Sequence, residues 1–343
     1  MKEIQEILTA ARQRRVTDIH IIANAPILFR IEGDLQPATK EPLTAKISKD
    51  LCYALLSPEQ IAEFESERDI DFMMADSDRN RHRVNISYND GRVGAVIRLL
   101  PSDPVPLDSL HLPEIATRVT RARKGLILIT GSTSQGKTTT LNAMIDHINR
   151  NARKHIVTIE DPIEYVHTNK NSIVRQREIG KDTRSFVRAL RAALRQDPNV
   201  IAIGEMRDYD TIKIALTAAE TGVLVLSTLH VISIDKIIER LLSYAPDGGD
   251  GHIRTLLAEA LLCIVHQELL PTIDGGKRIA AETLVATDAV RNVLRNRKTF
   301  HLRNAIMTGQ RYGMQPMKSS LDQLLAEGVI SDAVHDNVLE SYR

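Results

Sequence analysis

The 343-residue chain carries 45 Lys and Arg against 44 Asp and Glu, and hydrophobic residues make up 43% of it. A near-neutral chain of this length is expected to fold into two globular domains, and it lacks the basic excess typical of nucleic-acid-binding proteins. Two cysteines, Cys52 and Cys263, are too few for a disulfide framework or a four-cysteine zinc site. Charges interrupt the amphipathic N-terminus, unlike in a signal peptide, and the apolar run 261–265 is too short to span a bilayer. A cytoplasmic location is therefore expected.

The first 100 residues are predicted to form a small α/β domain with an antiparallel sheet. Residues 17–38 are rich in β-branched side chains and contain a Gly33-Asp34 turn signal, so they are interpreted as a pair of strands. Residues 58–66 are interpreted as a helix. A strand is expected from Asp69 onward, followed by a hairpin around Asn89-Asp90-Gly91.

The first strand of this hairpin has one apolar face and one polar face. Val84, Ile86 and Tyr88 alternate with polar residues, a pattern typical of a half-buried strand. Residues 101–113 then contain four prolines, which fix the backbone dihedral φ and remove hydrogen-bond donors. This segment is predicted to be a stiff, extended linker and the domain boundary.

Beyond residue 113, short apolar runs alternate with helical segments. Continuous apolar strands between helices imply a parallel sheet covered on both faces, which is an α/β architecture. The predicted strands are 125–130, 155–159, 199–204 and 223–228. The predicted helices are 138–149, 183–195 and 208–221, and several more follow residue 288.

The strongest motif is GSTSQGKT, which matches the phosphate-binding pattern G-x-x-x-x-G-K-[ST] between an apolar strand and a helix. Its glycines allow backbone N–H groups to surround an anion at the positive end of the helix. Lys137 is predicted to reach the β- and γ-phosphates of a nucleotide, and Thr138 to place its hydroxyl on Mg²⁺. The chain is therefore predicted to be an ATPase. The nucleotide-binding loop comprises Gly131, Ser132, Thr133, Ser134, Gln135, Gly136, Lys137 and Thr138.

Such an ATPase also needs an acid on a neighbouring strand, and two positions compete. Glu205 ends the run NVIAIGE and is the first choice to hold Mg²⁺ and its water. Glu160, together with Asp161 and Glu164, forms an acidic cluster at a strand end, where ligands bind in parallel sheets. Glu160 is the first choice to polarise the attacking water. The two assignments are interchangeable because the sequence gives no distances, and a solvated acidic turn is the alternative for the cluster.

His230 ends another apolar run that points to the same sheet edge. A lone histidine is commonly a structural hydrogen-bonding residue. Its position at a strand end makes contact with the γ-phosphate the competing interpretation.

Four segments together resemble the secretion ATPases of the type II and type IV pilus systems, and more narrowly their pilus-retraction branch. They are the Walker A box at 131–138, the Asp box IVTIEDPIEYVH at 156–167, the Walker B box ALRQDPNVIAIGEMRD at 193–208 and the His box TAAETGVLVLSTLH at 217–230. The segment AVRNVLRN resembles the AIRNLIRE region that marks retraction ATPases. The resemblance covers nearly the whole chain and is weakest in the first 80 residues.

The resemblance implies how the chain is organised and what it works with. It implies a PAS-like domain at 1–100, a linker at 101–113, a RecA-like ATPase domain at 114–287 and a helical region at 288–343. It also implies a homo-hexamer that uses ATP and Mg²⁺ to return pilin subunits to the inner membrane and so drives twitching motility. An inner-membrane platform protein is the expected partner, a second retraction ATPase is a further one, and nucleic acid is not expected.

Several positions depart from the family pattern. Ser134 and Gln135 stand where the family commonly has Gly-Ser, which restricts the loop backbone. Asn296 replaces the last residue, Glu, of the retraction segment. Val231 follows the His box, where a small polar residue is usual.

Arginines are needed to neutralise the charge that develops during phosphoryl transfer. Arg81 and Arg83 share one face of the predicted hairpin strand, and Arg98 lies across its turn. The family carries its arginine fingers on this hairpin, so the resemblance assigns them to these three residues, acting when the two domains close. A solvated strand face is the alternative.

Two further segments have candidate roles. Arginines one turn apart on the predicted helix 183–195 suggest a phosphate-sensing or intersubunit face, or else a face that forms ion pairs in solvent. These are Arg184, Arg188, Arg191 and Arg195. The retraction-like segment is the candidate for force coupling. It comprises Ala289, Val290, Arg291, Asn292, Val293, Leu294, Arg295 and Asn296.

Other functions compete with pilus retraction. A type IV secretion or conjugation ATPase has the same architecture, and gene neighbourhood distinguishes it. A RecA-like nucleic-acid motor is disfavoured by near-zero net charge and few aromatic residues. A regulator that binds ATP without hydrolysing it is the remaining alternative, suggested by Gln135 and Asn296.

Overall fold

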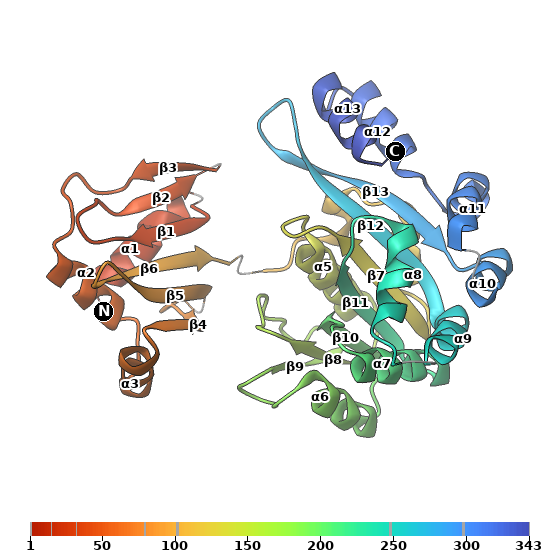
Figure 1. Ribbon diagram of the computed structural model, residues 1–343, viewed down its shortest axis with the longest axis horizontal. Helices are drawn as coiled ribbons and strands as arrows, with labels where there is room; N and C mark the ends of the chain where they lie inside the picture. The colour runs from red at the N-terminus through yellow and green to blue at the C-terminus, as the bar shows by residue number, and fades with distance from the viewer. Residues whose placement is uncertain are drawn as a thin grey trace. The chain divides into compact units, whose positions relative to one another are not determined.

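The computed structural model describes residues 2–14, 16–31, 33–78, 80–100, 103–246, 249–296 and 299–342 (Figure 1). It divides into two compact units, Met1–Asp103 and Pro104–Arg343. Pro101 and Ser102, the first residues of the predicted linker, lie outside the described residues. Within the described ranges, no helix combines the length and apolar character needed to cross a membrane.

The first unit is built on a six-stranded sheet in the order β3-β2-β1-β6-β5-β4, with every neighbouring pair antiparallel. Residues 17–38 form three strands, so the predicted pair is wrong. The additional reversal occurs at Asn24, which has a φ of 66°, a conformation that Asn tolerates better than most residues. The strands are β1 (Asp18–Ile21), β2 (Leu28–Ile31), β3 (Asp34–Pro37), β4 (Asp69–Ala75), β5 (Arg81–Asn89) and β6 (Arg92–Leu99).

Three helices share one apolar core with this sheet: α1 (Lys2–Gln13), α2 (Ala45–Tyr53) and α3 (Pro58–Glu67). The predicted helix at 58–66 is confirmed, and it begins where Ser57 and Gln60 cap each other's backbone N–H groups. The helix α2 was not predicted. As the alternation predicted, Val84 and Ile86 of β5 are fully buried.

The second unit contains a seven-stranded sheet in the order β13-β12-β7-β11-β10-β8-β9. Its strands are parallel except for the edge strand β13, which is antiparallel to β12, so the predicted parallel architecture is confirmed. Three of its strands, β9, β12 and β13, were not predicted. The strands are β7 (Gly125–Gly131), β8 (His155–Glu160), β9 (Ile173–Glu178), β10 (Val200–Glu205), β11 (Leu224–His230), β12 (Leu261–Pro271) and β13 (Lys277–Val285).

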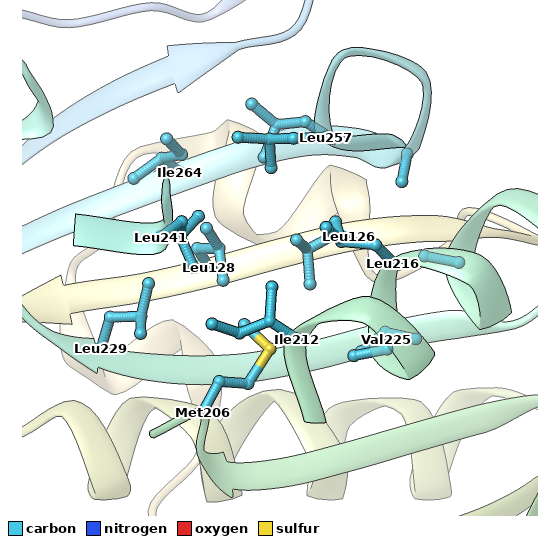
Figure 2. Packing of buried hydrophobic residues seen from close by; sticks show 14 of the residues in the cluster. Leu126, Leu128, Met206, Ile212, Leu216, Val225, Leu229, Leu241, Leu257 and Ile264 are labelled. Carbon is cyan, nitrogen blue, oxygen red and sulfur yellow. The ribbon is translucent and has the colours of Figure 1, made fainter. Parts of the chain in front are cut away.

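Helices cover both faces of this sheet. In β7, Leu126 and Leu128 point to one core, which Figure 2 shows packed with residues of α7, α8 and α9. Ile127 and Ile129 point to the opposite face, where they share a second core with α5. The helices α8 and α9 were not predicted. The α-helices are α4 (Glu114–Val119), α5 (Lys137–Asn151), α6 (Phe186–Ala193), α7 (Tyr209–Thr221), α8 (Ile234–Ser243), α9 (Asp250–Ala260), α10 (Asp288–Arg295), α11 (Leu302–Thr308), α12 (Met317–Ala326) and α13 (Asp332–Ser341). The 3-10 helices are η1 (Leu107–Leu110), η2 (Leu194–Gln196), η3 (Thr299–His301) and η4 (Gln310–Tyr312).

The ends of the second unit pack onto its sheet. The predicted extended conformation of the proline-rich segment is wrong at η1, where Leu107 is buried in the core beside α5. At the other end, Met317 and Leu321 of α12 pack against Leu270 and Ala280 of the β12–β13 hairpin. The predicted helical tail is confirmed, and its helices belong to the same compact unit as the sheet (Figure 1).

Candidate functional site

The phosphate-binding loop connects β7 to α5, and its glycines stand where the backbone requires them. Gly131 has a φ of 148°, and a β-carbon there would lie 2.4 Å from the backbone oxygen of Gln267. Gly136 has a φ of 78° and precedes the first residue of α5. Between them, Ser134 adopts a φ of 64°. The residue that replaces the family's common glycine is therefore in the left-handed region that glycine favours.

Lys137, the first residue of α5, is buried at this loop. Its ammonium donates a hydrogen bond to the carbonyl oxygen of Ser132 at 2.5 Å and lies 3.0 Å from Nδ1 of His230. Burial lowers the pKa of Lys137 to about 8, against the opposing charge of Glu205. The ammonium is thus poorly solvated and well placed to gain from an anionic ligand.

His230 lies between Lys137 and Glu205. Its Nε2 is 3.5 Å from Oε2 of Glu205. Burial and the nearby Lys137 lower the pKa of His230, while Glu205 opposes this shift. The neutral ring therefore accepts from the ammonium at Nδ1 and directs Nε2–H toward the carboxylate.

Glu205 ends β10 and has a cationic neighbour that the sequence did not single out. Arg207 places both Nε and a terminal guanidinium nitrogen 2.8 Å from Oε2 of Glu205. The only sequence signal for Arg207 was its place two residues after the acid, inside the Walker B box. The structure thus brings Lys137, His230, Glu205 and Arg207 together at the carboxyl ends of parallel strands.

Glu160 ends β8, the strand beside β10, and is buried. Its Oε1 accepts hydrogen bonds from Thr158 at 2.6 Å and from the side-chain amide of Gln176 at 3.0 Å. A β-carbon at Gly204 would lie 3.5 Å from the Cα of Glu160, so the two acid-bearing strand ends are in close contact. Thr158 lies inside the Asp box but was not singled out, and Gln176 lies on β9, outside every motif.

The rest of the acidic box differs in exposure. Asp161 is exposed and Glu164 is half-buried. The next residue, Tyr165, is buried, and its hydroxyl lies 3.1 Å from that of Thr139 in the first turn of α5. The Asp box therefore packs against the helix that begins with Lys137 and Thr138. No cluster of three or more metal-binding side chains occurs in the described part of the chain.

Gln135 connects the phosphate-binding loop to β12. Its side-chain oxygen accepts a hydrogen bond from the backbone N–H of Leu269, and its backbone oxygen accepts one from Gln267 at 2.6 Å. The residue that departs from the family pattern is thus part of the contact between the loop and the sheet. Val231, another departure, is buried in the core with α7, α8 and α9.

Arg83 and Arg98 lie directly opposite each other on β5 and β6 of the first unit. Arg83 forms an ion pair with Asp71, and Arg98 donates to Asp18 at 2.8 Å. These acids offset the repulsion that two directly opposed cations experience. Arg81 is half-buried at the beginning of the same strand. The assignment of the three arginines as fingers stays a prediction.

The predicted helix at 183–195 begins later than expected. Ser185 caps α6, so Arg184 lies before the helix, and Arg195 lies in η2 after it. The predicted row of four arginines on one α-helical face is therefore wrong. Ser185 itself has an extended backbone, and its side chain accepts a hydrogen bond from the N–H of Arg188, which fixes the start of the helix.

The retraction-like segment forms α10, which packs on α9. Arg291 donates to the backbone oxygens of Ala258, Glu259 and Leu261, which end α9, and Arg295 forms an ion pair with Glu259. Val290 and Leu294 are buried. Asn296, at the C-terminal end of α10, donates to the backbone oxygen of Asn292 at 2.9 Å. These arginines therefore hold two helices together.

Comparisons with known proteins agree with this fold. The family model for type II/IV secretion system proteins matches residues 1–336. The type IV pilus retraction ATPase PilT of Pseudomonas aeruginosa is 40% identical over 329 residues, covering 96% of each chain. A twitching motility protein of Neisseria gonorrhoeae is 40% identical over 312 residues, covering 90% of this chain and 83% of the relative.

The solved structures give the same result. A crystal structure of the pilus retraction motor PilT with bound ADP has a TM-score of 0.89 and 38% identity, covering 98% of this chain and 96% of the other. The chain belongs to the family of type II/IV secretion system proteins. Within that family it is an ATPase of the PilT retraction type.

Proposed function

We propose that the chain hydrolyses ATP at the 131–138 loop and that this reaction drives retraction of a type IV pilus, and hence twitching motility. The single observation that supports this most directly is the convergence of Lys137, His230 and Glu205 at one edge of a PilT-like sheet. Phosphoryl transfer depends mainly on positioning and on charge stabilisation, which these groups are suited to supply.

The residues present fit a magnesium ion that arrives with the nucleotide. The Thr138 hydroxyl and the Glu205 carboxylate are hard oxygen donors, and magnesium sites commonly use one or two protein oxygens together with phosphates and water. When bound, Mg²⁺ would neutralise charge on the β- and γ-phosphate oxygens. Thr138 and Glu205 are the proposed holding residues.

Glu160 is the proposed residue that polarises the attacking water. Its carboxylate is buried at the carboxyl end of β8, beside the end of β10 that carries Glu205, and Thr158 and Gln176 both donate hydrogen bonds to its Oε1. Lys137 would bind the β- and γ-phosphates. His230, neutral and hydrogen-bonded to Lys137, would contact the γ-phosphate, so that it would sense the phosphate while bonded to the lysine. Asp161 and Glu164 complete the proposed acidic box.

The remaining proposals concern assembly. Arg81, Arg83 and Arg98 would act as arginine fingers in a homo-hexamer, and closure of the two domains around ATP would supply the motion. The segment 289–296 would couple that motion to retraction. We place the motor at the cytoplasmic side of the inner membrane, with a pilus platform protein and a second retraction ATPase as partners and no role for nucleic acid.

Purified protein and its Glu205→Gln variant test the reaction, with ATPase rates and size analysis both measured in Mg-ATP. The variant is expected to lower kcat by about 10²-fold or more while still binding ATP, because only the charge at the acid changes. Glu239→Gln, an exposed acid on α8 outside the four motif boxes, is the matched control and should keep the wild-type rate. A hexamer with wild-type turnover in Glu205→Gln contradicts the assignment, and a folded wild-type protein that binds ATP without turnover indicates a regulator instead.

A further inference from the structure

The last helix of the chain is connected to the phosphate-binding loop by a row of hydrogen bonds that is buried at Thr130 and His266 and half-buried at Tyr342. Thr130, the residue before the loop, has its Oγ1 3.0 Å from Nδ1 of His266 on β12. Nε2 of the same ring lies 2.5 Å from the hydroxyl of Tyr342, which follows the last residue of α13. That hydroxyl donates to Oε1 of Glu268 at 3.2 Å.

The protonation states give this row a single direction. Burial, with a further contribution from Lys137, lowers the pKa of His266 to about 4, so the ring is neutral. Tyr342 donates its only proton to the Glu268 carboxylate and therefore accepts from Nε2–H of His266. Nδ1 of His266 then accepts from the Thr130 hydroxyl. Each donor in the row therefore has one acceptor, and removing one hydroxyl changes the hydrogen bonding of its neighbours.

The same stretch of β12 also holds the loop. Gln267 donates to the backbone oxygen of Gln135, and the N–H of Leu269 donates to its side chain. The backbone oxygen of Gln267 lies so close to Gly131 that a β-carbon there would be only 2.4 Å away. The side chains of His266 and Glu268 share one face of β12 and contact Tyr342, whereas the loop is contacted by the Gln267 side chain and the backbone N–H of Leu269.

We propose that Tyr342 is a positioning residue for nucleotide binding, acting through His266 and Thr130 on the phosphate-binding loop. The N–H groups of such a loop bind phosphates only when their directions are fixed, and β12 is the strand that fixes them. Removing the Tyr342 hydroxyl leaves Nε2–H of the buried His266 ring without its acceptor, and relieving that defect requires β12 or the His266 ring to move. This inference rests on the proposal that residues 131–138 bind nucleotide.

The test compares the affinity of the full-length protein for Mg-ADP, measured by calorimetric titration, with KM and kcat for ATP hydrolysis. Tyr342→Phe keeps the ring and removes only the hydroxyl, and it is expected to raise Kd and KM about three- to tenfold with little change in kcat. Ser341→Ala is the matched control, because it removes a hydroxyl from the neighbouring residue whose hydrogen bond to Val338 stays within α13. A Kd for Tyr342→Phe within about twofold of wild type, or an equal rise in Ser341→Ala, overturns the proposal.

A double-mutant cycle separates transmission through His266 from a general loss of packing. Thr130→Val removes the hydroxyl at the other end of the row, and Thr130→Ser retains it and should bind as wild type. If one row carries the effect, Thr130→Val combined with Tyr342→Phe raises Kd no more than the larger single change. If the rise in Kd of the double variant equals the product of the two single-variant rises, the proposal is overturned. Lys137→Ala separates failure of this inference from failure of the proposed nucleotide site. If Lys137→Ala binds ADP with wild-type affinity, the proposed nucleotide site itself is contradicted. If Lys137→Ala loses ADP affinity while Tyr342→Phe keeps it, only this inference is contradicted.

Discussion

The two sheets of this protein carry their charged side chains in different places. In the first unit, Asp71, Arg83, Arg98 and Asp18 form a row across four strands on one face. In the second unit, both faces are covered by apolar cores, and Lys137, Glu160, Glu205 and His230 gather at one edge.

Strand direction explains this difference. In an antiparallel sheet, successive strands end at opposite edges. Charged side chains therefore form ion pairs with side chains of neighbouring strands on the same face of the sheet. In a parallel sheet, the carboxyl ends of all strands meet at one edge, which becomes the ligand site. The comparison teaches that a parallel sheet gathers charged groups from several strands at one edge, whereas an antiparallel sheet pairs them with opposite charges on neighbouring strands of one face.

The largest expected effect concerns the charged face of the first unit. If its arginines serve as fingers, Arg81→Ala should lower kcat by about 10³-fold while leaving the affinity for ADP intact. Arg92→Ala provides the control, because Arg92 lies on β6 at the opposite end of the hairpin and pairs with Asp90 in the turn. Steady-state hydrolysis and ADP titration measure both quantities. Equal loss of binding and turnover indicates a folding defect, and unchanged turnover leaves the charged face as a solvated surface.

An intermediate effect is expected at the sheet edge of the second unit, as a pH dependence of ADP binding. The pKa of Lys137 in the free protein is lowered to about 8. Phosphate stabilises the ammonium and raises that pKa, so binding takes up a proton above pH 8 and Kd rises with pH, approaching tenfold per unit over about pH 8 to 9.5. Below pH 8 the lysine is charged in both states and contributes no slope. Lys137→Arg keeps its charge and should remove this dependence, and a flat wild-type profile argues against the buried lysine as the phosphate ligand.

The smallest expected effect concerns the helices that cover the second sheet. Asn296 caps the C-terminal end of α10, where the helix dipole is negative. Asn296→Glu restores the residue usual in the family, and it should lower the free energy of unfolding by about 0.3–1 kcal/mol. Thermal or denaturant unfolding measures this change, with Asn296→Gln as the neutral control. Equal stability of the Glu and Gln variants means that the charge does not interact with the helix end.

Local signals predicted some parts of the fold and not others. The strand β7, the loop and α5 were predicted because glycine spacing, an apolar run and a following helix agree with one another. The hairpin of β12 and β13 was missed, although residues 261–265 are strongly apolar, because a short apolar run alone does not distinguish strand from helix. The start of α6 was placed three residues early because periodicity extends through Arg184, whereas the Ser185 cap fixes the actual boundary.

The sequence by itself determined the phosphate-binding loop, the parallel strand pattern and the acids at the ends of β8 and β10, because each depends on neighbours within a few residues. Only the tertiary structure decided which groups meet. The contact of Lys137 with His230 joins residues 93 positions apart, and that of His266 with Tyr342 joins residues 76 apart. Nothing in local spacing encodes such pairs, because the order of strands in the sheet and the packing of α5 and α13 against it bring them together.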